Sequence, residues 1–134
     1  MTSNGVRAER APARWWAVHL SGDVDLATAP DLDALMARVE ARHRNDGVVL
    51  DLSAVPFMDC AGLHPLVRAR RRLGSGLRLR APQRRVLRLL QLTDLVDRLG
   101  VLHDVDAWPA EADPQQCGRF GDDPPDLTSV VLGS

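Results

Sequence analysis

The stretch from Val48 to Leu63, which reads VVLDLSAVPFMDCAGL, decides how this chain folds. Its first three residues are a short apolar run that ends at Asp51, a pattern typical of a buried strand. After the loop, Asp59 precedes apolar residues that recur at helical spacing, namely Leu63, Leu66, Val67 and Leu73. The stretch therefore predicts a buried strand, a loop, and a helix that begins after Asp59.

The same alternation continues on both sides of this unit. Upstream, residues 15–20 predict a strand, and Thr28 is expected to cap a helix whose apolar side consists of Leu32, Leu35, Met36 and Val39. Downstream, residues 77–80 predict a strand, residues 83–92 a helix, and residues 101–102 a last short strand. Strands that alternate with helices indicate an α/β domain with parallel strand pairs and right-handed crossovers.

The length of 134 residues is that of one domain. We expect residues 14–107 to form its core, preceded by an N-terminal segment over residues 1–13. Residues 108–134 are acidic and rich in Pro and Gly, with too few apolar side chains to offset the entropy cost of ordering. We therefore predict a mostly disordered tail over residues 108–134.

The composition excludes several classes of enzyme. The chain has no Lys, Ile or Tyr, which indicates a bacterium with a GC-rich genome, because the codons of these residues are AT-rich. A P-loop and Schiff-base chemistry both need a lysine. The four histidines lack the spacing of a zinc site, and no nucleophile motif is present. We therefore expect no catalytic activity, no metal and no cofactor.

The sequence also bears on the compartment. No apolar stretch approaches the roughly 18 residues of a membrane span, and residues 1–14 lack the apolar segment of a signal peptide. We therefore expect a cytoplasmic protein. In that compartment Cys60 and Cys117 stay reduced unless they serve as a redox pair.

A cluster of nine arginines lies between Cys60 and Thr93, a stretch that contains no Asp or Glu. Nucleic-acid binding is disfavoured, because the cluster lacks aromatic residues for base stacking and no known binding motif accompanies it. We expect a solvated or protein-facing basic surface instead. The nine residues are Arg68, Arg70, Arg71, Arg72, Arg78, Arg80, Arg84, Arg85 and Arg88.

Three segments together resemble the STAS domain (sulfate transporter and anti-sigma factor antagonist). The stretch from residue 48 to 63 is similar to the family signature, in which a strand ending in Asp-Leu-Ser leads through Phe-(Ile/Met)-Asp-Ser-Ser-Gly-Leu into a helix. Residues 20–30 resemble the upstream Leu-x-Gly-x-Leu-Asp stretch, and residues 77–95 resemble the strand and third helix that follow. The resemblance covers about residues 5–107.

The resemblance implies a fold and a partner. It implies a mixed, mostly parallel sheet with helices packed alongside, opened by an additional N-terminal strand at about residues 5–11. It also implies an anti-sigma factor antagonist, which binds an anti-sigma factor of the GHKL serine-kinase type and so releases a sigma factor. Two other readings stay open: a scaffold subunit of a stressosome or lipid-transport assembly, and a redox sensor acting through Cys60. A homodimer is also open.

The chain departs from the family at the phosphorylated serine, where it has Cys60, followed by Ala61. Neither side chain carries a hydroxyl, so a serine kinase would find no acceptor at the usual site. Alternatively, a thiol at a helix N-terminus can become reactive and pair with the tail residue Cys117. Pro65 is a further departure, because it removes an amide donor early in the helix.

The resemblance also implies which residues meet the partner. They are the residues at the strand ends, in the adjoining loops and in the first turn of the second helix: Asp23, Asp25, Asp59, Cys60, Ala61, Gly62 and Leu63. The alternation of strands and helices predicts that Asp59 and Cys60 lie in the loop entering the second helix, beside the turn of Asp23 to Asp25. Among them, Gly62 is also expected to be structural, at a place where no Cβ fits.

Overall fold

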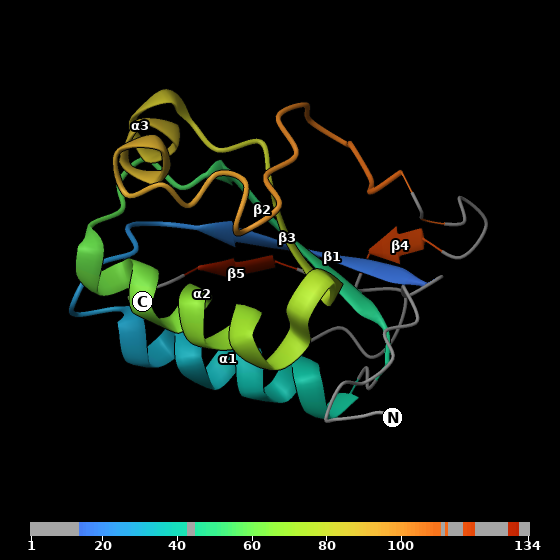
Figure 1. The fold of residues 1–134 in the computed structure, drawn as a ribbon. Helices are drawn as coiled ribbons and strands as arrows, with labels where there is room; N and C mark the ends of the chain where they lie inside the picture. Colours follow the sequence, from blue (N-terminus) through green and yellow to red (C-terminus); the bar gives the residue numbers. More distant parts are fainter. Residues whose placement is uncertain (1–13, 43–44, 111, 113–116, 120–128, 132–134) are drawn as a thin grey trace, which may run out of the picture.

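A parallel sheet with helices on both sides forms the folded part of the chain (Figure 1), a computed structural model in which residues 14–42, 45–110, 112, 117–119 and 129–131 are described. In chain order the elements are β1 (Trp15–Ser21), α1 (Ala29–Arg42), β2 (Gly47–Ala54), α2 (Cys60–Leu73), the 3-10 turn η1 (Gly74–Gly76), β3 (Leu77–Arg80), α3 (Arg84–Leu92), β4 (Cys117–Arg119) and β5 (Ser129–Val131). Strands and helices alternate as far as α3, so the prediction of a single α/β domain is confirmed.

The order of the strands in the sheet is β3-β2-β1-β4, and β5 also pairs with β1. Every pairing between the described strands is parallel. The additional N-terminal strand expected at residues 5–11 lies outside the described residues. The strand expected at residues 101–102 is reduced to one isolated bridge, between Leu102 and Arg80.

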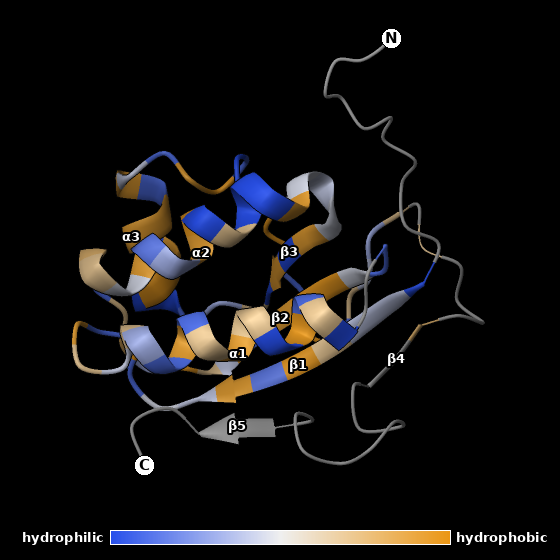
Figure 2. Cartoon of the chain, turned by 90° about the horizontal axis from the view of Figure 1, so that it is seen from below, coloured by the Kyte–Doolittle hydropathy of each residue, from blue (hydrophilic) through white to orange (hydrophobic). Residues whose placement is uncertain are grey.

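One face of the sheet carries the main core, against α1 and α2. Alternate residues of a strand point to the same face, so Val18 and Leu20 of β1 lie beside Leu50 of β2 in one buried cluster. The helices contribute the apolar positions expected from their spacing, such as Leu35 and Leu66. Figure 2 shows α1 and α2 in front of the sheet with hydrophobic and hydrophilic residues alternating along them, as amphipathic helices require.

A buried ion pair occupies the other face. Arg80 Nε donates to Asp51 Oδ2 at 2.9 Å, and each side chain is only 3% exposed. Ser53 adds two hydrogen bonds to Asp51 Oδ1, from its backbone N–H at 3.0 Å and its hydroxyl at 2.6 Å. Burial opposes the charge on Asp51, but the Ser53 hydrogen bonds and the Arg80 guanidinium outweigh it, so the pKa of Asp51 lies below its ordinary value.

The segment that follows α3 covers this ion pair. The guanidinium of Arg80 lies 5.2 Å from the ring centroid of Trp108 and donates through Nη1 to the Ala107 carbonyl at 3.2 Å. Nearby, Arg78 Nε donates to the Gly100 carbonyl at 2.9 Å. Two arginines of β3 thus attach residues 100–108 to the sheet, and Figure 1 shows this segment on the opposite side from α1 and α2.

The C-terminal part contains two strands where the sequence predicts disorder. Residues Cys117–Arg119 pair with the first half of β1, and Ser129–Val131 pair with its second half. The edge of β1 that faces away from β2 offers unpaired backbone groups, which a tail can bind without a core of its own. Both strands lie within residues 108–134, the segment predicted to be mostly disordered, and most of the rest of that segment lies outside the described residues.

None of the helices within the described residues is both long enough and apolar enough to span a membrane.

Candidate functional site

Two loops meet at the carboxyl ends of β1 and β2 and form what we call the rim, residues 22–28 and 55–59. A parallel bridge joins Val24 to Met58. The Val24 N–H donates to the Phe57 carbonyl at 2.9 Å, and the Asp59 N–H donates to the Val24 carbonyl at 3.1 Å. The structure therefore brings Asp59 beside the loop that contains Asp23 and Asp25, as expected from the sequence.

Cys60 is the first residue of α2, and it is exposed at the rim. Asp59 is the N-cap, and its Oδ1 accepts a hydrogen bond from the Gly62 N–H at 3.0 Å. This cap starts the helix directly after the rim, even though Pro65 removes one amide donor from the next turn. The thiol of Cys60 is thus held at a capped helix start and faces solvent.

Gly62 and Leu63 belong to the packing beneath the rim. A Cβ built on Gly62 would lie 2.3 Å from the Val24 carbonyl oxygen, closer than any real Cβ contact, so the structural role expected for this glycine is confirmed. Leu63 is 4% exposed and lies in the main core. Gly62 and Leu63 were expected to meet a partner, but both are buried. The surface that a partner can reach here consists of the rim, Cys60 and half-buried Ala61.

Asp25 and Thr28 fold the β1–α1 loop. The Thr28 hydroxyl accepts from the Asp25 N–H at 2.9 Å and donates to the Asp23 carbonyl at 2.8 Å, while Asp25 Oδ1 accepts from the Thr28 N–H at 3.1 Å. Asp25 is therefore half-buried and structural, whereas the Asp23 side chain is exposed at the rim. Thr28 directly precedes α1, at the predicted N-cap position, but its hydroxyl bonds to the preceding loop and not to the amides of the helix.

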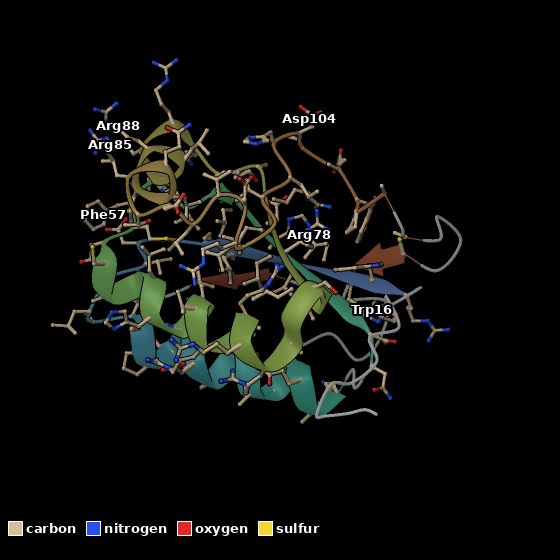
Figure 3. The ribbon with its side chains drawn as sticks, in the orientation of Figure 1. Trp16, Phe57, Arg78, Arg85, Arg88 and Asp104 are labelled. Atoms are coloured by element: carbon tan, nitrogen blue, oxygen red, sulfur yellow. The ribbon has the colours of Figure 1, made fainter. Side chains whose placement is uncertain are left out.

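Two exposed apolar side chains complete the rim, and sequence reasoning did not single them out. Leu26 is 76% exposed and Phe57 is 40% exposed. Figure 3 shows Phe57 at the end of the molecule where α2 begins. The signal that would have identified Leu26 and Phe57 is an apolar residue in a loop, outside the predicted strands and helices whose apolar positions form the core. Exposed leucine and phenylalanine side chains on two adjoining loops are typical of a protein-docking surface.

Cys60 and Cys117 lie at opposite ends of the sheet. Cys117 pairs with Trp15 at the start of β1, whereas Cys60 follows the bridge beyond the end of β1. The seven residues of β1 separate these levels by six steps, about 20 Å at about 3.3 Å per step. A disulfide needs Cα atoms within about 7 Å, so an intramolecular pair between these two cysteines does not fit this arrangement.

The described residues contain no group of three or more His, Cys, Asp or Glu side chains that could hold a metal ion. The chemistry that the rim and the adjoining Cys60 offer is that of a surface: one thiol, the exposed Asp23 carboxylate, and two apolar side chains on loops fixed by backbone hydrogen bonds.

Comparisons with known proteins bear on the family and the fold. The model of the STAS domain family matches residues 9–107. Among solved structures, a sulfate transporter family protein from Wolinella succinogenes is similar, with a TM-score of 0.57 and 20% identity over 73% of this chain and 84% of that chain. At this identity the likeness concerns the fold alone. No curated protein sequence matches significantly.

Proposed function

Because the chain belongs to the STAS domain family, we propose that it acts as an anti-sigma factor antagonist in the bacterial cytoplasm. In this role it binds an anti-sigma factor of the GHKL serine-kinase type through the rim and the start of α2, and so releases a sigma factor. The activity is binding, without a catalysed reaction of its own.

The observation that carries the proposal is the position of Cys60. It stands where the family has its phosphorylated serine, exposed at the first position of α2 and directly after the Asp59 cap. Leu26 and Phe57 supply exposed apolar contact area on the two loops beside it. A partner that docks on these loops covers Cys60, so the charge at this residue controls docking.

Replacement of serine by cysteine removes the usual switch. Phosphorylation would add a charge of about −1.5 to −2 at the rim and oppose docking. Cys60 and Ala61 offer no hydroxyl to a serine kinase. The chain therefore stays in its binding-competent form while the kinase is active.

The test is binding to each GHKL-type serine kinase encoded in the same genome, measured by calorimetry with and without ATP. At least one kinase should bind the wild-type chain, and ATP should change neither its mass nor its affinity. Cys60→Ser should bind equally well at first and then gain a phosphate and lose affinity with ATP. Binding to none of the kinases, or a phosphate on the wild-type chain, would contradict the proposal.

A second pair of variants isolates the effect of charge. Cys60→Asp should weaken binding at least about 30-fold, because a buried, unpaired interfacial charge costs about 2–5 kcal/mol. Ser75→Asp is the matched control, since it adds the same charge on an exposed residue beyond the other end of α2. Equal affinities for these two variants would remove Cys60 from the interface.

The second candidate function is that of a scaffold subunit. The similar solved structure favours this alternative, because that protein is described as belonging to a sulfate transporter family. A scaffold would bind other STAS proteins or a membrane permease in place of a kinase. Native mass spectrometry of the full chain with neighbouring gene products distinguishes the two candidates. A redox sensor would lose binding reversibly in oxidant, and Cys60→Ala would not.

A further inference from the structure

The exposed side of α3 carries three arginines and a leucine, which we call the α3 face: Arg84, Arg85, Arg88 and Leu92. The opposite side of the helix is buried through Val86 and Leu90. Leu92 is 73% exposed. The α3 face is thus a mixed basic and apolar surface, and no acidic residue lies within the helix.

The α3 face lies next to the rim. Gln83, the N-cap of α3, donates through Nε2 to the Ser53 carbonyl at 2.8 Å, which fixes the start of α3 to the end of β2. Figure 3 shows Arg85 and Arg88 pointing away from the fold at the same end of the molecule as Phe57. A protein docked on the rim would therefore reach the α3 face.

The arginines of the α3 face differ from most others in the same stretch. Among the described residues, no carboxylate forms an ion pair with Arg84, Arg85 or Arg88. Other arginines are engaged within the fold: Arg68 with Asp33, Arg72 with Glu40, Arg78 with Gly100 and Arg80 with Asp51. The α3 face therefore has its full positive charge available to a partner.

Two of these arginines stand where the fold itself disfavours them. Arg84 and Arg85 occupy the first turn of α3, at the positive end of the helix dipole, and no acidic residue is there to offset them. Their positive charges destabilise the helix start. A destabilising pair on an exposed surface is consistent with a role in binding.

The number of charges indicates which anionic partner fits. Specific nucleic-acid binding typically uses about 6–10 phosphate contacts, and anionic lipid recognition uses clusters of about 4–8 basic residues. The α3 face has only three arginines together with exposed Leu92, and Phe57 lies at the same end of the molecule (Figure 3). Arginine combined with aromatic and aliphatic side chains is the composition of a protein interface.

We propose that the α3 face binds an acidic segment of a partner protein, one that presents carboxylates to Arg84, Arg85 and Arg88 and apolar side chains to Leu92 and Phe57. The proposal deepens the proposed function, since the same kinase would dock on the rim and place this segment on α3. In the complex, Arg84, Arg85 and Arg88 then form ion pairs with carboxylates of the partner, which the described residues of their own chain do not provide.

The test is a titration of the isotope-labelled full chain with an acidic amphipathic peptide that carries Glu and Leu on one side, followed by NMR. Amide shifts should concentrate in α3 and around Phe57, and should weaken as salt rises, because exposed charges are screened over about 8 Å at physiological ionic strength. A counterpart peptide with Gln in place of every Glu should bind less. Absence of shifts in α3 would overturn the proposal.

Charge reversal provides the matched control. Arg85→Glu/Arg88→Glu should weaken binding of the peptide about tenfold. Its thermal midpoint should equal or exceed that of the wild type, since Glu at position 85 suits the first turn of the helix and position 88 is exposed. Arg38→Glu/Arg71→Glu changes net charge equally on exposed residues of α1 and α2, and should leave binding unchanged. Equal losses in both variants would overturn the proposal.

Further probes separate the alternatives. Tighter binding of duplex DNA or phosphatidylserine vesicles at the α3 face would overturn the assignment to an acidic protein segment. Kinase binding that survives Arg85→Glu/Arg88→Glu unchanged would overturn the claim of a shared partner. Peptide binding at α3 without binding of any GHKL kinase would contradict the proposed function and leave the α3 face supported.

Discussion

Replacing Asp51 by asparagine should lower the free energy of unfolding by about 3–5 kcal/mol at neutral pH. The substitution keeps the shape of the side chain and removes its charge. Arg80 would then keep a buried guanidinium with no counter-charge, because both side chains are only 3% exposed. For a domain of about 100 residues, this loss corresponds to a thermal midpoint lower by at least about 12 °C.

The magnitude follows from the contacts of the carboxylate. Its two oxygens accept from Arg80 Nε at 2.9 Å, from the Ser53 hydroxyl at 2.6 Å and from the Ser53 N–H at 3.0 Å. Hydrogen bonds to a charged group contribute about 1.5–3 kcal/mol each when they are buried. An asparagine retains one acceptor oxygen, so part of this hydrogen-bond network survives. The loss of stability is therefore smaller than the summed contribution of the three hydrogen bonds.

Urea denaturation of the full chain, followed by circular dichroism, measures the loss. Asp33→Asn is the matched control, because it removes a carboxylate that also pairs with an arginine, at 2.6 Å from Arg68, but with side chains 41% and 48% exposed. Exposed pairs contribute about 0–1 kcal/mol. A loss below about 1 kcal/mol for Asp51→Asn, or equal losses for both variants, would refute the reasoning.

The pH dependence of the same variant has a definite sign. The pKa of Asp51 is lower in the folded chain than its ordinary value of 3.8. The stability that this shift provides is complete above the unfolded pKa and is lost as pH falls through the folded pKa. The difference between wild type and Asp51→Asn should therefore be constant near neutrality and narrow below about pH 4. A constant difference down to pH 2 would contradict this.

Two further predictions concern packing and the surface. Gly62→Ala should destabilise the fold by about 1–3 kcal/mol in urea denaturation, because its Cβ would lie 2.3 Å from the Val24 carbonyl oxygen and the backbone would have to shift. Unchanged stability would show that the backbone around Val24 can shift at no cost and would contradict the prediction. Arg72→Ala should lower the free energy of unfolding by no more than about 1 kcal/mol, and by less in high salt. Arg72 makes two hydrogen bonds to Glu40, but the pair is partly exposed and therefore contributes little. A loss above about 2 kcal/mol that does not depend on salt would contradict this.

The parts of the fold that the sequence predicts are those governed by local periodicity. Apolar spacing at Leu32, Leu35 and Met36 predicts one helix, and the apolar run that Asp51 closes predicts the central strand. The chain order of these elements, together with the motif around Asp59, was enough for the fold and for the contact between the two loops of the rim.

The parts that the sequence did not predict depend on which strands pair and in which register. Arg80 belongs to a cluster expected to face solvent or a partner, yet the register places it beside Asp51 in the sheet. Val48 pairs with Leu77, and counting along each strand from these two residues, Asp51 and Arg80 both come fourth. An alignment of the two strand sequences from Val48 and Leu77 would therefore have placed Asp51 beside Arg80. Likewise, β4 and β5 depend on an edge of β1 that no local pattern in the tail encodes.

The bridge between Val24 and Met58 has a kinetic consequence for any partner of the rim. Because backbone hydrogen bonds hold the two loops to each other, the surface is preorganised, and docking orders little of the chain. Encounter should then proceed at a rate set by diffusion and charge, with little dependence on uncharged substitutions at Cys60 such as Cys60→Ser or Cys60→Ala. Variants of this residue should differ in how long the complex lasts, so residence time is the quantity through which this chain would control its partner.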